Sequence, residues 1–158
     1  MSTINYIHLN AAKSEKTVAM LQQLLADFQV YYTNLRNYHW NVKGEAFFAL
    51  HSKFEELYDD AAEKVDEIAE RILMLGGTPE SKFNAYLKVA KIKEVETTSD
   101  VKVIIPNILD NLKEFISQER AILAFASEAG DESTVSLMSD YLGEQEKLVW
   151  MLVAVNSK

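Results

Sequence analysis

The 158-residue chain contains no cysteine, which excludes disulfide bonds and metal sites built on thiolates. It also holds only 5 glycines and 2 prolines. Because these two residues mark most turns, their scarcity favours a few long helices over many short strands. The chain has no apolar run near the roughly 18 residues that cross a membrane, and residues 1–10 lack the pattern of a signal peptide. We therefore expect a cytoplasmic protein without a membrane segment.

Positive charge is also scarce, since the chain has 16 lysines and arginines but 24 aspartates and glutamates, and its formal net charge is −8. A surface with this balance repels the phosphate backbone, which argues against broad affinity for nucleic acid. The same balance attracts cations. The charge therefore favours a substrate that is itself positively charged.

Apolar residues recur at helical spacing through four long segments, at about 14–41, 46–75, 99–129 and 131–155. We expect N-caps for the first, third and fourth helices at Ser14, at Thr98 or Ser99, and at Asp131. The pair Gly76-Gly77 is a typical end for the second helix. Pro106 lies in the first two turns of the third helix, where we expect a kink or a later start.

The connection over residues 78–98 is too long for a hairpin between neighbouring helices, and it predicts a crossover. We expect a short helix at 84–89 inside it. The sequence thus predicts an all-α four-helix bundle with a long crossover between helices two and three. We take it as a single domain over residues 1–158, with residues 1–13 as a flexible N-terminal arm.

The second helix carries two pairs of candidate metal ligands, His51 with Glu55 and Asp66 with Glu70. The i, i+4 spacing places both members of a pair on one helix face. At about 100° per residue, all four side chains fall within an arc of about 100°. One imidazole and three carboxylates suit a first-row divalent metal such as iron.

A single chain cannot bring these two pairs to one metal. His51 and Asp66 are about 22 Å apart along the helix at 1.5 Å per residue, whereas a metal lies about 2.0–2.2 Å from its ligands. A second, antiparallel copy of the helix, related by a two-fold axis near residues 60–61, would bring each pair to the other. Ala61 and Ala62 lie at the expected crossing, where small side chains permit close approach.

The positions of the histidines argue against a two-iron centre that is held within one chain. Most bundles that hold two irons inside one chain carry Glu-x-x-His twice, and this motif is absent from the sequence. His39, before the short break at 42–45, should lie close to His51, after it. With Glu55 they could form a half-site of two imidazoles and one carboxylate.

A structural interpretation competes with the metal site. His39, beside Trp40, can be a core or interface histidine. The acidic residues of the second helix can be ordinary surface charges, or Asp66 and Glu70 can pair with Lys64 or Arg71.

Three stretches of the sequence resemble the Dps-like mini-ferritins. They are LRNYHWNVKG at 35–44, FALH at 48–51 and DEIAERILMLGG at 66–77. The resemblance covers nearly the whole chain, including the ending Trp150-Met151-Leu152. It implies a ferritin-like bundle that assembles as a hollow homododecamer with tetrahedral symmetry.

The resemblance also implies ferroxidase centres between two-fold-related subunits, each holding two irons that pass from Fe(II) to Fe(III). The family ligands fall on His39, His51, Asp66 and Glu70. A family aspartate falls on Glu55, which is longer by one methylene. The implied reaction is oxidation of Fe(II), preferentially with hydrogen peroxide, followed by storage of the ferric mineral and protection against oxidative damage.

Two further family features fall on this sequence. Trp40 matches a tryptophan thought to intercept stray oxidising equivalents, and its alternative role is that of an interface aromatic. Acidic residues lie where three-fold pores form in similar proteins, at Glu128, Asp131, Glu132 and Asp140.

Many relatives bind DNA through a lysine-rich N-terminal arm. Residues 1–16 contain only Lys13 and Lys16, so we expect DNA binding to be weak or absent. Two other functions stay open: a DNA-compacting nucleoid protein with an incidental metal site, and a non-catalytic store of zinc or manganese that uses the same ligands.

Overall fold

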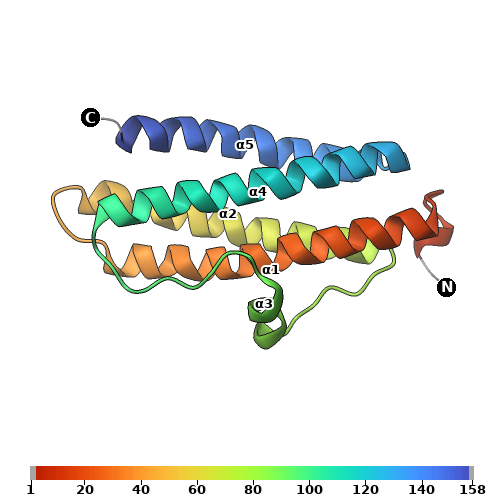
Figure 1. The fold of residues 1–158 in the computed structure, drawn as a ribbon, viewed down its shortest axis with the longest axis horizontal. Helices are drawn as coiled ribbons and strands as arrows, with labels where there is room; N and C mark the ends of the chain where they lie inside the picture. Colours follow the sequence, from red (N-terminus) through yellow and green to blue (C-terminus); the bar gives the residue numbers. More distant parts are fainter. Residues whose placement is uncertain (1–2, 157–158) are drawn as a thin grey trace.

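The computed structural model describes residues 3–156, and their secondary structure is entirely helical (Figure 1). The four long helices are α1 (Ala11–Asn41), α2 (Phe47–Met74), α4 (Val101–Ala129) and α5 (Glu132–Asn156). A short helix, α3 (Phe83–Val89), lies outside the bundle, and a 3-10 turn, η1 (Thr3–Asn5), precedes α1. The predicted all-α fold is confirmed.

The direction of the helices explains the crossover. α1 and α2 are antiparallel neighbours, and so are α4 and α5 (Figure 1). α2 and α4 run in the same direction, so the chain must return along the bundle between them. It does so beside α1, with α3 part of the way along this return (Figure 1). The predicted crossover and its short helix are therefore confirmed.

Buried polar side chains on α1 hold the crossover in place. The carboxylate of Asp27, which is fully buried, accepts the backbone N–H groups of Lys91 at 2.7 Å and Ile92 at 2.9 Å. Seven residues further along α1, the side chain of Asn34 donates to the carbonyl of Lys93 at 2.8 Å. These bonds satisfy backbone groups that an irregular segment would otherwise leave unpaired.

The start of α1 differs from the prediction. Asn10 caps the helix, because its side chain accepts the backbone N–H of Lys13 at 3.0 Å. Ser14 is buried inside the helix, so the predicted cap there is wrong. Residues 11–13, predicted to be part of a flexible arm, form the first turn of α1, and Leu9 packs against the core. Residues 1 and 2 of that arm lie outside the described residues.

The start of α4 also differs. Asp100 is its N-cap, with a side chain that accepts the backbone N–H of Lys102 at 2.9 Å, so a cap at Thr98 or Ser99 is wrong. The helix continues through Pro106, so a later start there is wrong as well. Two other predicted ends are confirmed: the Asp131 side chain caps α5, and Gly76 follows α2 in the left-handed conformation.

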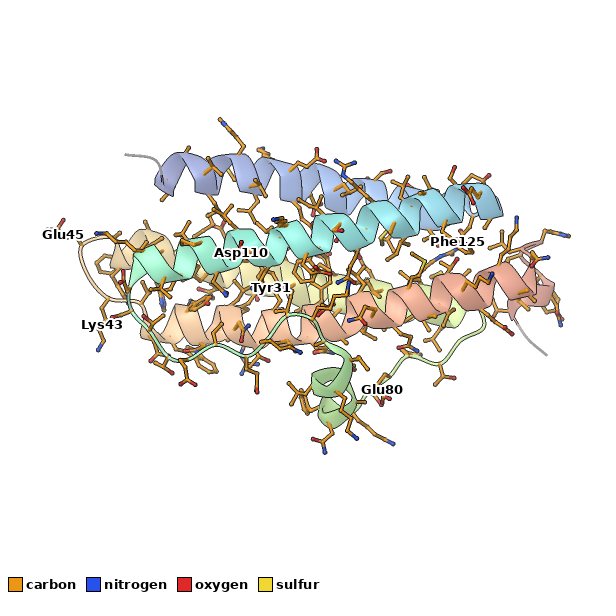
Figure 2. The ribbon with its side chains drawn as sticks, in the orientation of Figure 1. Tyr31, Lys43, Glu45, Glu80, Asp110 and Phe125 are labelled. Carbon is orange, nitrogen blue, oxygen red and sulfur yellow. The ribbon has the colours of Figure 1, made fainter. Side chains whose placement is uncertain are left out.

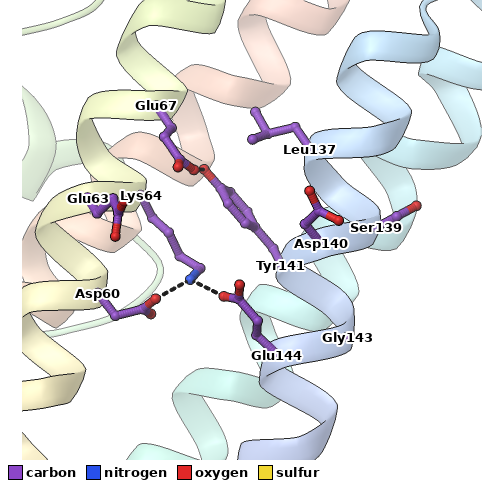
Figure 3. A pocket seen from close by; sticks show the side chains of 10 residues that line it. All are labelled: Asp60, Glu63, Lys64, Glu67, Leu137, Ser139, Asp140, Tyr141, Gly143 and Glu144. Atoms are coloured by element: carbon purple, nitrogen blue, oxygen red, sulfur yellow. Dashed lines mark hydrogen bonds and ion pairs between the residues drawn. The ribbon is translucent and has the colours of Figure 1, made fainter.

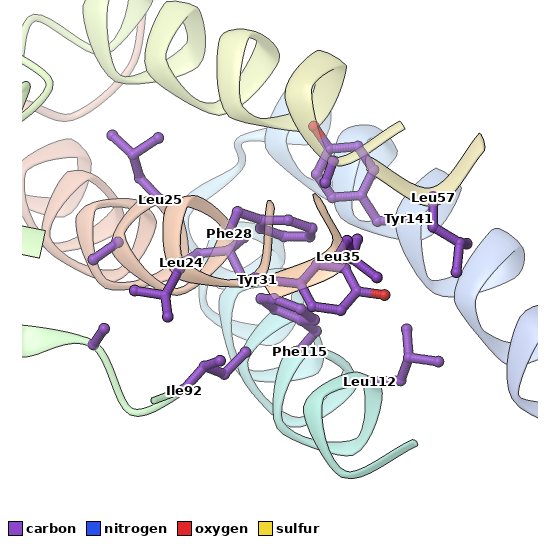
Figure 4. Packing of buried hydrophobic residues seen from close by; sticks show 14 of the residues in the cluster. Leu24, Leu25, Phe28, Tyr31, Leu35, Leu57, Ile92, Leu112, Phe115 and Tyr141 are labelled. Carbon is purple, nitrogen blue, oxygen red and sulfur yellow. The ribbon is translucent and has the colours of Figure 1, made fainter. Parts of the chain in front are cut away.

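An aromatic cluster joins α1, α4 and α5 inside the bundle (Figure 4). Phe28 stacks on Phe115 with ring centroids 4.0 Å apart, and Tyr31 meets Phe115 edge-on at 5.1 Å. Tyr141 lies 6.3 Å from Phe28. All four side chains are buried. Burial of apolar area stabilises by about 25 cal/mol per Å², so these large rings hold the three helices firmly against one another.

A buried ion pair joins the end of α2 to the start of α5. The guanidinium of Arg71 donates to the carboxylate of Asp131 at 2.6 Å and to the hydroxyl of Thr134 at 2.9 Å. The alternative pairing of Arg71 with Asp66 or Glu70 is therefore wrong. Because Asp131 is only 3 % exposed, it is a cap and an ion-pair partner rather than an acid that lines a pore.

Candidate metal centre

A short turn between α1 and α2 brings two histidines together at one end of the bundle. The chain reverses within residues 42–46, where Gly44 takes a φ of 106° and Phe47 donates its N–H to the Gly44 carbonyl at 3.0 Å. Figure 2 shows Lys43 and Glu45 on the outside of this turn. His39 thereby lies in the last turn of α1, and His51 near the start of α2.

Each of these histidines is hydrogen-bonded to the backbone of the other. Nδ1 of His39 lies 2.8 Å from the carbonyl oxygen of His51, and Nδ1 of His51 lies 2.9 Å from the carbonyl oxygen of His39. A carbonyl oxygen only accepts, so each Nδ1 must carry a proton. In a neutral imidazole this leaves a lone pair on Nε2. The hydrogen bond at Nδ1 therefore fixes the tautomer of each imidazole and leaves its Nε2 atom available to a metal.

Aromatic contacts fix the planes of both imidazoles. The two rings stack with centroids 3.7 Å apart and an interplanar angle of 19°. Phe47 stacks on the outer side of the pair against His51 at 4.9 Å, and Tyr58 meets His39 edge-on at 5.2 Å. His39 is only 8 % exposed. The predicted proximity of the two histidines is confirmed.

Glu55, one helical turn after His51, completes a group of three. One ligand atom from each of His39, His51 and Glu55 lies within 4.8 Å of the other two. His39 is buried, His51 is half-buried, and Glu55 is exposed, so the group opens to the surface. Over residues 3–156 it is the one cluster of histidine and acidic side chains compact enough to hold a metal ion. Its nitrogen and oxygen atoms suit iron.

Asp66 and Glu70 lie further along α2 and outside this group. Both are exposed, and neither forms an ion pair with any residue of the described chain. The alternative pairing with Lys64 is wrong, because that lysine bonds to other acids. His51 and Asp66 are separated by about 22 Å along the helix at 1.5 Å per residue. One chain therefore presents two separate halves of the predicted ligand set.

The two alanines between these halves have different surroundings. Ala61 is fully buried in its own bundle, so its predicted place at a helix crossing is wrong. Ala62 is exposed and lies on the same face of α2 as the candidate ligands. Leu73, on that face as well, is 52 % exposed. The outer face of α2 thus carries small and apolar side chains that have no cover within one chain.

Trp40 is adjacent to His39 in sequence but 64 % exposed. The Arg36 guanidinium lies over its ring at 4.8 Å and over the ring of Tyr32 at 5.1 Å. Tyr32 meets Tyr58 edge-on at 6.0 Å. Partial burial and then the negative charge of Glu55 raise the pKa of Tyr58, so this phenol is protonated at neutral pH.

A second charged cluster lies between α2 and α5 (Figure 3). Lys64, which is 3 % exposed, donates to Asp60 at 2.5 Å and to Glu144 at 2.6 Å. Burial disfavours the ammonium ion, but these two bonds outweigh it and raise the pKa of Lys64. The hydroxyl of Tyr141 donates to Glu67 at 2.6 Å. The cavity beside these groups measures about 450 Å³, and its other acidic lining residues are Glu63 and Asp140.

Glu119 on α4 is a buried carboxyl that sequence reasoning missed. One of its oxygens accepts the side-chain amide of Gln145 at 2.7 Å, and the other has no hydrogen-bond partner within the described chain. Burial, only partly offset by Gln145, raises the pKa of Glu119 to about 8. The sequence indicates that Glu119 is buried, because the residue lies on the apolar face of the third predicted helix, between Phe115 and Ile122.

The geometry defines a class: a four-helix bundle with a long crossover that carries a compact cluster of two histidines and one carboxylate. The sequence profile of the ferritin-like domain matches residues 18–158. The DNA protection during starvation protein of Porphyromonas gingivalis is 54% identical over 138 residues, which are 87% of each chain.

Solved structures agree with this sequence similarity. The Dps protein of Vibrio cholerae O1, described as a member of a broad superfamily of ferritin-like diiron-carboxylate proteins, has a TM-score of 0.94 and 48% identity over 96% of each chain. A Dps protein from Bacillus brevis has a TM-score of 0.89 and 34% identity, over 92% of this chain and 98% of that one. The chain belongs to the ferritin-like family, and within it to the Dps proteins.

None of the helices in residues 3–156 combines the length and the apolar character that a membrane crossing requires.

Proposed function

We propose that this protein is a ferroxidase and an iron store. It oxidises Fe(II), preferentially with hydrogen peroxide, and keeps the ferric mineral inside a hollow dodecamer with tetrahedral symmetry, which protects the cell from oxidative damage. The observation that carries the proposal is the pair His39 and His51, whose Nδ1 atoms are both held by hydrogen bonds and which forms one compact group with Glu55. Membership of the ferritin-like family, and a relative described as a diiron-carboxylate protein, support iron as the metal.

The second half of each centre comes from another copy of the chain. His39, His51 and Glu55 would act together with Asp66 of the partner subunit and Glu70 of the partner subunit. The exposure of both acids and their lack of ion pairs within the chain support this arrangement. A two-fold axis forms each site twice. Three carboxylates and two neutral imidazoles nearly balance the charge of two Fe(II) ions.

The ligands serve the reaction by holding two electron donors side by side. Each Fe(II) supplies one electron, the O–O bond of one peroxide breaks, and two hydroxide ions form beside two Fe(III). Both electrons reach the same peroxide, so no hydroxyl radical is released. The fixed planes of His39 and His51 keep their nitrogens in place throughout. Glu55, with its extra methylene and its exposed position, is the ligand best able to move with the metal.

DNA compaction is the weaker alternative, because one of the two lysines near the N-terminus is hydrogen-bonded within the chain. The ammonium group of Lys13 donates to the carbonyl of Glu128 at 3.0 Å, near the end of α4. A cation there complements the negative end of the helix dipole. Protection of DNA, for which the P. gingivalis relative is named, does not require binding when Fe(II) and peroxide are removed together.

The test is anaerobic addition of Fe(II), followed by peroxide or by dioxygen, with the ferric absorbance recorded over time. We expect faster oxidation with peroxide and a particle of about twelve chains that retains iron. A protein that binds Fe(II) but leaves its oxidation rate at that of the buffer would support a zinc or manganese store instead. Cell fractionation tests the cytoplasmic location that forms part of the proposal.

A further inference from the structure

A second cavity between α2 and α5, of about 250 Å³, has a lining that includes none of the candidate metal ligands. Most of its wall is apolar. The apolar lining residues are Phe28 on α1, Leu57 on α2, Leu112 and Phe115 on α4, and Leu148 and Met151 on α5. A cavity of about 150 Å³ with a wall of this kind takes up benzene. The cavity between α2 and α5 therefore has room for a single ring that carries a small substituent.

Two buried polar atoms in this wall have no hydrogen-bond partner within the described chain. They are the hydroxyl oxygen of Tyr31 and the side-chain oxygen Oε1 of Gln145, on residues that are 4 % and 5 % exposed. The amide nitrogen of Gln145 donates to Glu119 at 2.7 Å, which leaves the oxygen of the same amide as a free acceptor. Figure 4 shows the hydroxyl of Tyr31 directed between Leu57 and Leu112, which line the cavity. Because a buried polar atom without a partner is costly, both atoms indicate a ligand that forms hydrogen bonds.

The charged side chains around the cavity are already paired with one another. Lys53 forms an ion pair with Glu56. Lys64 forms ion pairs with Asp60 and Glu144, which also line the cavity. An ionic ligand would lose its hydration here without gaining an unpaired opposite charge, and that loss is expensive. The lining therefore favours a neutral ligand.

We propose that this cavity binds a small neutral phenol. The hydroxyl of such a ligand satisfies both unpartnered atoms, because it donates to Gln145 and accepts from Tyr31. Burial raises the pKa of Tyr31, so this side chain keeps the proton that it donates. The ring of the ligand lies among the apolar side chains of the wall. The inference does not depend on the proposed ferroxidase function, because the candidate metal ligands take no part in it.

Isothermal titration calorimetry of the assembled, metal-free protein, with phenol as the probe, measures the binding. We expect saturable binding of about one phenol per chain. Toluene has a similar shape but no hydroxyl, and benzoate adds a negative charge. Both should bind at least about tenfold more weakly than phenol, because a site built around hydrogen bonds rejects an analogue that cannot form them. Absence of saturable phenol binding, or equal affinity for toluene and phenol, would overturn the inference.

Two variants test the location of the ligand. Tyr31→Phe keeps the ring and removes the hydroxyl, so we expect phenol to bind about tenfold more weakly and toluene to bind as before. Leu148→Trp fills the cavity and should abolish phenol binding. The matched controls are Tyr6→Phe, on an exposed tyrosine, and Leu123→Trp, on a half-buried leucine of α4 outside the cavity lining. Unchanged affinity for phenol in Tyr31→Phe or in Leu148→Trp would overturn the site.

Thermal unfolding gives a second readout that does not depend on heats of binding. A ligand that binds only the folded chain raises the unfolding temperature, so phenol should raise it in the unmodified protein relative to Leu148→Trp. An equal response of the two proteins to phenol would overturn the inference. Ferric absorbance after addition of Fe(II) and peroxide, without phenol, tests the ferroxidase function separately. Absence of ferric product together with saturable phenol binding would overturn that function and support this inference.

Discussion

His39 and His51 each use Nδ1 to donate a hydrogen bond to the backbone carbonyl of the other, at 2.8 and 2.9 Å. The turn between α1 and α2 and the two candidate ligands are therefore one structural unit. Each imidazole holds the backbone that carries its neighbour, and neither ring can rotate without loss of a bond. This coupling fixes both the tautomer and the direction of the Nε2 lone pairs before any metal arrives.

Removal of either imidazole should leave the fold intact and slow iron oxidation. We expect His39→Ala and His51→Ala to reduce the peroxide-driven rate by at least about tenfold, because each takes away a nitrogen ligand and also the bond that orients the other. Stopped-flow ferric absorbance measures the rate. His8→Asn, at the remaining histidine, is the control, and asparagine tolerates its φ of 56°. Unchanged rates in both alanine variants would remove these residues from the centre.

Glu119→Gln should stabilise the protein in mild alkali. The native carboxyl has a pKa of about 8, whereas an unfolded glutamate has a pKa of about 4.3. Between pKa values of about 4.3 and about 8, the unfolded chain loses a proton that the native state keeps. The contribution of Glu119 to the free energy of unfolding is therefore fully present below the unfolded pKa and falls as the pH rises towards the native pKa. The loss is on the order of a few kcal/mol, and glutamine abolishes it.

Urea unfolding at about pH 5 and about pH 8.5, at fixed protein concentration, measures this difference. The unmodified protein should lose stability between the two pH values relative to Glu119→Gln. Glu128→Gln, at an exposed position, serves as the control and should lose as much stability between the two pH values as the unmodified protein. If Glu119→Gln also loses as much stability as the unmodified protein, Glu119 is ionised in the native state.

Asp131→Ala should destabilise the protein by about 3–5 kcal/mol, because it leaves the buried Arg71 guanidinium without its partner. It also removes the cap of α5. Asp131→Asn keeps a capping oxygen and should cost less. Thermal unfolding of both variants, with Glu132→Ala at the neighbouring exposed residue as the control, measures the contributions. Equal losses for alanine and asparagine would mean that the capping oxygen contributes little and that the charge of Asp131 accounts for the loss.

Binding to duplex DNA should be absent near neutral pH at about 150 mM salt, where charges further apart than about 8 Å are screened. The formal charge of −8 per chain gives the surface no excess of cations for phosphate contacts, and Lys13 is already bound to the end of α4. A gel shift with Mg²⁺ chelated measures binding. A retarded complex that persists under these conditions would show that twelve weak N-terminal contacts act together.

The bundle and the histidine pair could be predicted from the sequence because both depend on local spacing. Helical periodicity marks the four long helices, and a short break between His39 and His51 requires the two to meet. The reciprocal bonds of these histidines could not be predicted, because they join side chains to backbone across a turn whose dihedral angles the sequence does not specify.

The hydrogen-bond partners of buried polar side chains could not be predicted from the sequence either. Asp27 and Asn34 are polar residues on an apolar helix, which indicates that each has a buried partner. The partners, however, are backbone groups more than fifty residues away in the crossover. Ala61 was misplaced for a related reason. Its neighbour in sequence, Ala62, is equally small, and only the tertiary structure decides which of the two faces the bundle.

Co-assembly of two inactive variants tests the central claim, that each centre is shared between two chains. His51→Ala and Glu70→Ala are refolded together, and native mass spectrometry confirms mixed particles. In a mixed two-fold pair, one site carries both defects and the other carries none. Random mixing makes half of the pairs mixed, so about a quarter of the sites should be active. Recovery of peroxide-driven iron oxidation near that level is the predicted result. Well-mixed particles that stay as inactive as either parent would contradict a shared centre.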